Sequence, residues 1–308
     1  MSSTLLAHLM GRYALFLETV RGRHDLAERY YRRAIAIDPD HVPNRGRYAV
    51  FLETVRRDYD GAEEQYQQAL SVAPNDPVLL GNFADFLETA RGEYDGAEQF
   101  YRRALEVAPL HPNNLTNFAT FLTEVRAEYD RAESLYQRAL EVAPTHRNAL
   151  FKYAIFLTDV RREYEAAETL YRRGLAVAPD NPAMLANYAG LLLLAGKREE
   201  GLEALATALR HRSLQSPSAD AAECWFYAVV HGAPEGRGTA LTALRRVLET
   251  GVRSPGFHLE PHVAIAVREG HPWADWLEVL AEVVTDQAPL GVLEPWEAWR
   301  TASPGVIH

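Results

Sequence analysis

Side chains with metal-binding chemistry gather in one short stretch, where His258, Glu260 and His262 follow one another closely. Imidazole nitrogens and carboxylate oxygens are common zinc ligands. Pro261, however, would interrupt a helix that aligned the two histidines, and their short spacing matches no standard zinc motif. We therefore predict no metal site in this stretch.

The single cysteine, Cys224, lies beside Trp225 and seven residues before His231, a pair that could supply a nucleophile and a base. A lone cysteine in an apolar segment is more typical of a buried, inert side chain. It also excludes an intramolecular disulfide and a cysteine-based zinc site. The sequence has no glycine-rich phosphate loop and no G-x-S-x-G turn. We predict no catalytic residues and no cofactor.

The composition is that of a globular protein with an acidic surplus. The 308 residues include 32 basic and 42 acidic side chains, which gives a net charge of −10. Nucleic-acid binding needs clustered positive charge, so this balance argues against such a partner. No apolar run approaches the ~20 residues that span a bilayer, and no signal peptide is evident. We expect a cytoplasmic protein that is not bound to a membrane, and the preference for arginine over lysine indicates a GC-rich bacterial genome.

An internal repeat of 35 residues organises the first two thirds of the chain. Small, aromatic and proline positions recur at this period, which is typical of stacked supersecondary units. The clearest series is Phe16, Phe51, Phe86, Phe121 and Phe156. Four other series keep the same period, running from Ala14 to Ala189, Ala27 to Ala167, Tyr31 to Tyr171 and Pro39 to Pro179.

Each repeat predicts two helices. In the unit from Val78 to Pro112, Leu80, Phe83 and Leu87 recur at three- and four-residue steps on one helical face. The segment around Tyr101 shows the same pattern for a second helix, which the proline at the end of the unit terminates. Because one unit cannot bury its apolar face alone, the aromatic residues are expected to form a core between stacked neighbours.

The paired small residues, the alanine and tyrosine of the second helix, and the closing proline resemble the tetratricopeptide repeat over about residues 5–215. This resemblance implies an all-α, right-handed superhelical solenoid of helix pairs. The usual period is 34 residues, and the extra residue is predicted to lie between the two helices, in stretches such as Glu88 to Tyr94. The sixth unit has a shorter turn and lacks the tyrosine and the proline, so the array is predicted to end there.

These patterns divide the chain into three parts. Residues 1–182 contain five repeats, and residues 183–215 contain a sixth, degenerate one. Residues 216–308 lose the period and contain all five tryptophans. This part is either a cap, which we favour because the end of a solenoid exposes apolar surface, or a separate module. Its predicted helices lie near 219–231, 237–250, 260–269, 272–286 and 294–301.

An arginine recurs near the end of each first helix, at Arg21, Arg56, Arg91, Arg126 and Arg161. A cation at this place faces the negative end of the helix dipole and can bond the last carbonyls. In the first three units a glutamate lies three residues earlier, a favourable helical spacing. We therefore interpret these arginines as structural and not as a phosphate-binding stripe.

The resemblance also implies where a partner would bind, because the first helices of tetratricopeptide arrays line a concave surface that takes ligands. Some members hold extended peptides through asparagines on the residue before each core aromatic, since an amide pairs with both groups of a peptide unit. Glu53 and Glu88 would form an acidic wall beside them. The residues before the six core aromatics are all polar: Arg12, Arg47, Asn82, Asn117, Lys152 and Asn187.

The sequence leaves three hypotheses for function. The favoured one is a non-catalytic protein–protein interaction scaffold that binds a peptide or protein segment in the concave groove. An alternative is a structural protein whose repeats stack end to end into homo-oligomers. The least favoured is an enzyme with its activity in residues 216–308, because no constellation with catalytic spacing appears there.

Overall fold

The chain is all-α in a computed structural model that describes residues 3–255 and 257–302, and these residues contain no strand. Residues 256 and 303–308, which belong to the predicted C-terminal part, lie outside the described residues. The chain forms two compact units, Met1–Ala149 and Leu150–His308, called unit 1 and unit 2 below. The fold class predicted from the sequence is confirmed.

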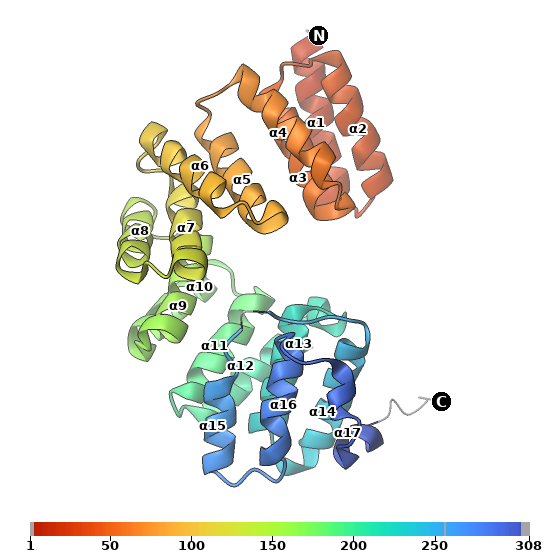
Figure 1. The fold of residues 1–308 in the computed structure, drawn as a ribbon, viewed down its shortest axis with the longest axis vertical. Helices are drawn as coiled ribbons and strands as arrows, with labels where there is room; N and C mark the ends of the chain where they lie inside the picture. The colour runs from red at the N-terminus through yellow and green to blue at the C-terminus, as the bar shows by residue number, and fades with distance from the viewer. Residues whose placement is uncertain (1–2, 256, 303–308) are drawn as a thin grey trace. The chain divides into compact units, whose positions relative to one another are not determined.

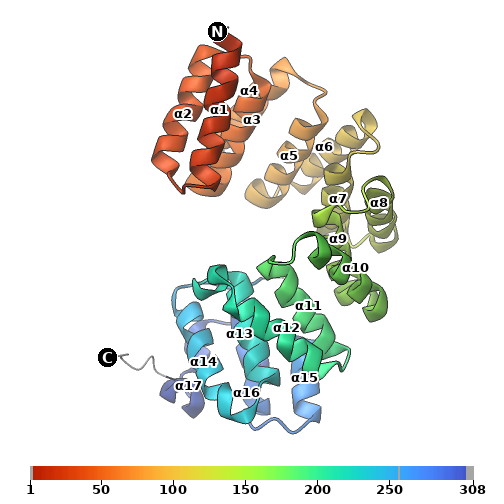
Figure 2. The same ribbon diagram turned by 180° about the vertical axis from the view of Figure 1, so that it is seen from behind.

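Unit 1 consists of antiparallel helix pairs, one pair in each repeat, and the two helices of a pair lie side by side (Figures 1 and 2). The next helix, α9 (Arg147–Phe156), begins in unit 1 and ends in unit 2. The four pairs are α1 (Ser3–Thr19) with α2 (His24–Ile37), α3 (Val42–Phe51) with α4 (Tyr59–Val72), α5 (Pro77–Phe86) with α6 (Tyr94–Val107), and α7 (Pro112–Phe121) with α8 (Tyr129–Val142).

In the second to fifth 35-residue repeats, the extra residue widens the end of the first helix into a π-helical turn. The N–H of Arg57, for example, donates to the carbonyl of Leu52, five residues back. The residue after the turn is left-handed, with φ of 57° at Arg57 and 67° at Gly92. The extra residue therefore belongs to the last turn of the first helix, whereas the sequence placed it in the connection. The turns cover Leu52–Arg56, Leu87–Arg91, Leu122–Arg126 and Leu157–Arg161.

The aromatic core of unit 1 lies between successive repeats. The buried ring of Tyr66 on α4 packs against Phe86 on α5, with ring centroids 5.4 Å apart, and Tyr101 packs in the same way on Phe121 at 5.5 Å. The hydroxyl of Tyr101 donates back to Glu88 Oε2 at 2.9 Å. Each tyrosine thus joins its own helix pair to the next one, which is how a solenoid builds a continuous core.

The recurring arginines also connect consecutive repeats. Arg91 Nη2 lies 2.7 Å from both Asp60 Oδ1 and Glu63 Oε2, which belong to the preceding repeat. Its guanidinium carbon lies 5.6 Å from the ring centroid of Phe86. Arg56 and Arg126 bind the equivalent acidic pairs. Their place at the helix end matches the sequence prediction, and the contact with the preceding repeat is an addition from the structure.

Unit 2 is organised around α13 (Ala219–His231), which contacts α11, α12, α14, α15 and α16. Its side chains Phe226, Tyr227 and Val230 are buried in a core that also includes Trp296 and Trp299. The helices predicted after residue 216 are present with adjusted bounds. After α9, the other α-helices of unit 2 are α10 (Tyr164–Val177), α11 (Pro182–Leu194), α12 (Arg198–Arg210), α14 (Pro234–Glu249), α15 (Glu260–Arg268), α16 (Ala274–Val284) and α17 (Glu297–Thr301).

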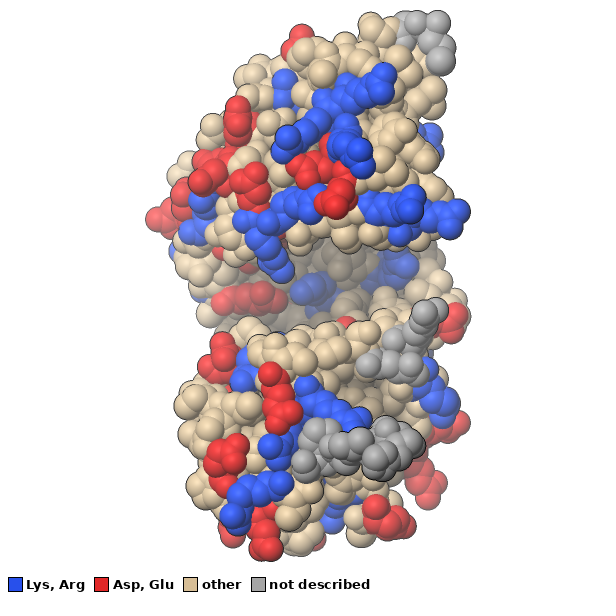
Figure 3. Space-filling model, turned by 90° about the vertical axis from the view of Figure 1, so that its right-hand side faces the viewer, with Lys and Arg blue, Asp and Glu red and all other residues tan. Residues whose placement is uncertain are grey.

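Charged side chains of both signs lie next to one another over each unit on the face drawn in Figure 3. Among the described residues, no helix combines the length and the apolar character needed to cross a membrane.

Candidate functional site

The six polar positions predicted for the groove lie on consecutive first helices. In unit 1, Arg12 on α1 is exposed, whereas Arg47 on α3, Asn82 on α5 and Asn117 on α7 are half-buried. The 35-residue spacing gives each the same place in its repeat. Lys152 on α9 and Asn187 on α11 are half-buried members of unit 2.

The three half-buried positions in unit 1 have unused hydrogen-bonding capacity. Within residues 3–255 and 257–302, the side chains of Asn82 and Asn117 make no hydrogen bond, and the buried Nη1 of Arg47 has no acceptor. Asn187 differs, because its Nδ2 donates to the carbonyl of Ala183 in its own helix at 3.0 Å. Buried polar groups are normally satisfied, so the free groups of unit 1 mark a surface that can accept a polar partner.

A cluster of carboxyl groups adjoins these positions in unit 1. Burial and the neighbouring Asp85 carboxylate raise the pKa of Glu53 to about 7. The Tyr66 hydroxyl donates to Glu53 at 3.4 Å, as Tyr101 does to Glu88 at 2.9 Å. Both glutamates are half-buried. Part of each carboxylate is therefore used within its own repeat.

The potential catalytic residues of unit 2 are buried, and two of them, His231 and His262, are hydrogen-bonded to each other. His231 Nε2 and His262 Nδ1 are 2.9 Å apart, and burial lowers the pKa of both rings, that of His231 to about 4. His262 therefore pairs with a histidine on α13 and not with the nearby His258. Burial raises the pKa of the Cys224 thiol well above its usual range, which disfavours the nucleophilic thiolate. The described parts of the chain contain no group of three side chains placed to hold a metal ion.

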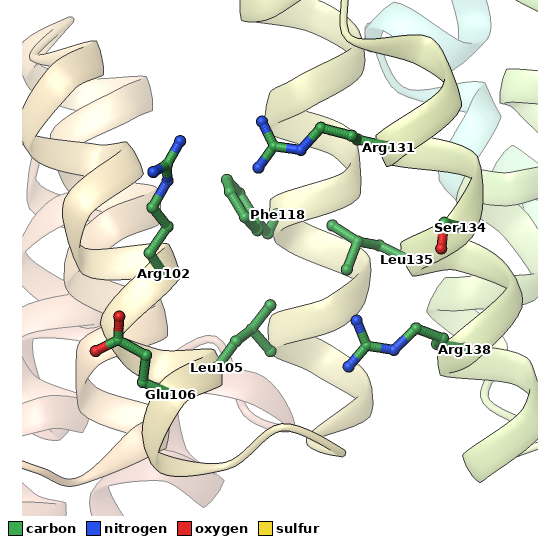
Figure 4. Close-up of a pocket in the computed structure, with 8 residues that line it drawn as sticks. All are labelled: Arg102, Leu105, Glu106, Phe118, Arg131, Ser134, Leu135 and Arg138. Atoms are coloured by element: carbon green, nitrogen blue, oxygen red, sulfur yellow. The ribbon is translucent and has the colours of Figure 1, made fainter.

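A cavity of about 460 Å³ opens between the second helices of the third and fourth repeats. Phe118, on the first helix α7, forms its floor, and side chains from α6 and α8 surround this ring (Figure 4). The sequence did not predict this site, because the recurring aromatic residues were expected only to form the core between stacked neighbours. The residue that could have indicated the site is Arg131, because the other 35-residue repeats have an uncharged residue at this position. These residues are Leu26, Gly61, Gly96 and Ala166. The lining includes Arg102, Leu105, Phe118, Arg131, Leu135 and Arg138.

The stacked helix pairs, with side chains presented in register along their first helices, define an all-α helical-repeat protein that offers extended surfaces for binding. Family models of the tetratricopeptide repeat match residues 21–41, 56–114 and 126–182. The chain belongs to the tetratricopeptide-repeat family, as its sequence pattern predicted, and tetratricopeptide arrays are protein–protein interaction scaffolds.

Solved structures share this fold at low sequence identity. A tetratricopeptide repeat protein from Parabacteroides merdae has a TM-score of 0.57 and 16% identity, with 91% of this chain and 99% of that chain covered. The pilF protein of Pseudomonas aeruginosa has a TM-score of 0.54 and 19% identity over 69% of this chain and 95% of its own. PilW, a type IV pilus biogenesis factor, has a TM-score of 0.55 and 18% identity, with coverages of 68% and 94%. No curated protein matches the sequence.

Proposed function

We propose that the first helices of unit 1 bind an extended segment of a partner protein, with Asn82 and Asn117 pairing with its backbone. The observation that carries this proposal is the unused hydrogen-bonding capacity at one register of successive repeats, at Arg47, Asn82 and Asn117. An amide offers both a donor and an acceptor, so it can pair with a peptide unit whatever side chain that unit bears. Binding would then depend on the path of the segment more than on its sequence.

Charged positions beside the amides give the segment a preferred composition. Arg12 and Arg47 favour a carboxylate on the partner. The partly ionised Glu53 and its neighbours Asp85 and Glu88 favour a lysine or arginine further along. The preferred segment therefore carries charges of both signs. In unit 2, Lys152 and Asn187 hold the same register and are the corresponding candidates there.

Selection of random twelve-residue peptides on the full chain, followed by fluorescence anisotropy with the selected peptides, tests this proposal. The double variant Asn82→Ala, Asn117→Ala should weaken binding by about 2 to 3 kcal/mol, or 30- to 150-fold, because each amide contributes about 1 to 1.5 kcal/mol. The control Asn148→Ala removes an exposed amide outside this register. Equal affinities of the double variant and the control would refute the proposal.

We also propose that the helices after residue 216 cap the repeat array. The support comes from unit 2, where α13 packs on α11 and α12 and shares a core with Ala189, Leu193 and Leu205 of the sixth repeat. Deletion of residues 216–308 would expose this apolar surface. The truncated chain should then aggregate in light scattering, and a monodisperse truncated chain would favour a separate module.

A further inference from the structure

We propose that the cavity above Phe118 is a second binding site, which takes an aromatic side chain of a partner protein together with an anionic group on or beside that ring. It uses the second helices α6 and α8, whereas the proposed peptide surface uses the first helices. Successive residues of a helix point about 100° apart, so Asn117 and Phe118 leave α7 in different directions. The two sites can therefore be tested separately.

The fourth repeat lacks a tyrosine hydroxyl that other repeats have at the same position. Arg32 Nε donates to the hydroxyl of Tyr48 in the next repeat at 2.8 Å, and Arg172 Nε donates to Tyr188 at 3.0 Å. Arg102 occupies the same register, but the residue opposite is Phe118, which has no oxygen. In the part of the chain that the structure describes, Nε of Arg102 has no acceptor, and its Nη2 donates to Glu98.

The fourth repeat also lacks an aromatic ring that the third repeat has beside its core aromatic. In the third repeat, Phe100 packs edge-on against the core aromatic Phe83, with centroids 4.8 Å apart. The fourth repeat has Leu135 in the register of Phe100 and Phe118 in the register of Phe83. The smaller leucine leaves space beside the Phe118 ring. A partner's aromatic side chain placed there would make the contact that Phe100 makes one repeat earlier.

Basic side chains outnumber acidic ones in the lining of the cavity. Arg131 stands where the second and third repeats have glycine, and its guanidinium carbon lies 6.0 Å from the Phe118 ring centroid. Arg102, Arg131 and Arg138 line the cavity with one carboxylate, that of Glu106, and Arg102 and Arg131 also pair with Glu98 and Glu128 of their own helices. The side chains of the three arginines project around Phe118 (Figure 4). Guanidinium groups bind carboxylate or phosphate oxygens well, so an anionic aromatic group fits better than a neutral one.

Fluorescence anisotropy with labelled nine-residue peptides in a Gly-Ser frame tests the ligand class. The peptides carry a central phosphotyrosine, a tyrosine between two glutamates, a phosphoserine, or an unmodified tyrosine. We expect one of the first two to bind the full chain at least tenfold more tightly than the last two, and the better of them identifies the source of the anion. Binding of phosphoserine as tight as that of both anionic aromatic peptides would overturn the proposal, as would no binding at all.

Two variants copied from the chain's own repeats test the location. Leu135→Phe fills the space as Phe100 does, and Phe118→Tyr gives Arg102 the acceptor that Arg32 has. Each should weaken the best peptide at least tenfold, whereas Arg33→Ala, an exposed position on α2, should not. Thermal unfolding verifies that each variant folds, and Phe118→Tyr adds only one oxygen. Unchanged affinity in either folded variant would overturn the location.

Discussion

A glycine in the middle of α5 is predicted to be needed for the contact between two first helices. The Nδ2 of Asn114 on α7 donates to the carbonyl of Pro77 on α5 at 2.8 Å, and its side chain lies against Gly81. A Cβ at Gly81 would lie 2.3 Å from Asn114 Oδ1, a separation that forces the amide to move. The equivalent glycine one repeat earlier, Gly46, has Leu79 Cδ1 as its nearest atom at 3.6 Å, which is ordinary contact.

The effect of Gly81→Ala on the free energy of unfolding is the sum of one stabilising and two destabilising contributions. Alanine stabilises a helix interior by about 1 kcal/mol relative to glycine. At Gly81 the displaced Asn114 loses a buried hydrogen bond, at a cost of about 1 to 3 kcal/mol, and overpacking adds about 1 to 3 kcal/mol. Gly81→Ala should therefore lower the free energy of unfolding by about 1 to 5 kcal/mol. Gly46→Ala meets no such contact and should raise it by up to about 1 kcal/mol.

Urea titrations of the full chain, followed by far-ultraviolet circular dichroism, measure these free energies. Asn114→Ala should itself be destabilising, but Gly81→Ala in that background should cost at least about 1 kcal/mol less than in the wild type, because the clash is gone. The chain already contains a pair of this kind one repeat later. There Thr116, which is larger, replaces Gly81, and Ala149, which is smaller, replaces Asn114. Equal stabilities of Gly81→Ala and Gly46→Ala, or strict additivity with Asn114→Ala, would refute the reasoning.

Three further predictions concern pH and backbone conformation. Burial raises the pKa of Glu223, which accepts a hydrogen bond from Ser254, from 4.5 to about 8. The folded state therefore holds a proton that the unfolded state releases, so the free energy of unfolding should fall as the pH rises from about 5 to 8. Glu223→Gln should reduce this dependence of the free energy on pH in urea titrations. Equal pH dependence in the variant and the wild type would contradict a buried neutral carboxyl. Ala127 has a left-handed φ of 54°, and Gly92 stands at the same position in the preceding repeat. Because glycine adopts this conformation more easily, Ala127→Gly should raise the free energy of unfolding by about 0.5 to 1 kcal/mol and Gly92→Ala should lower it by about 1 to 2 kcal/mol. Melting temperatures of the two variants that shift in the same direction would refute this prediction. Because the pKa of Glu53 is about 7, a cationic peptide in the proposed groove should bind more tightly at pH 8 than at pH 6 by anisotropy, and Glu53→Gln should remove the difference.

The sequence by itself determined the repeat, its two helices and the family. These features are encoded locally, because helical periodicity and the order of small, aromatic and proline residues depend on neighbours only a few positions away. The polar register of the first helices, including Asn82 and Asn117, could likewise be predicted from the 35-residue spacing. The same spacing located the arginines at the ends of the first helices.

The tertiary structure decided which distant groups meet. The sequence offered Arg91 a glutamate three residues away, whereas its guanidinium binds Asp60 and Glu63, 31 and 28 residues away in the preceding repeat. The extra residue of the period became part of a π-helical turn, Leu87–Arg91 in the third repeat, and Arg91 at the end of this turn contacts that neighbour. Leu135 on α8 and Phe118 on α7 line one cavity with side chains of α6 only because the fold packs these helices together. Such pairings depend on distances between helices, which local sequence patterns do not specify.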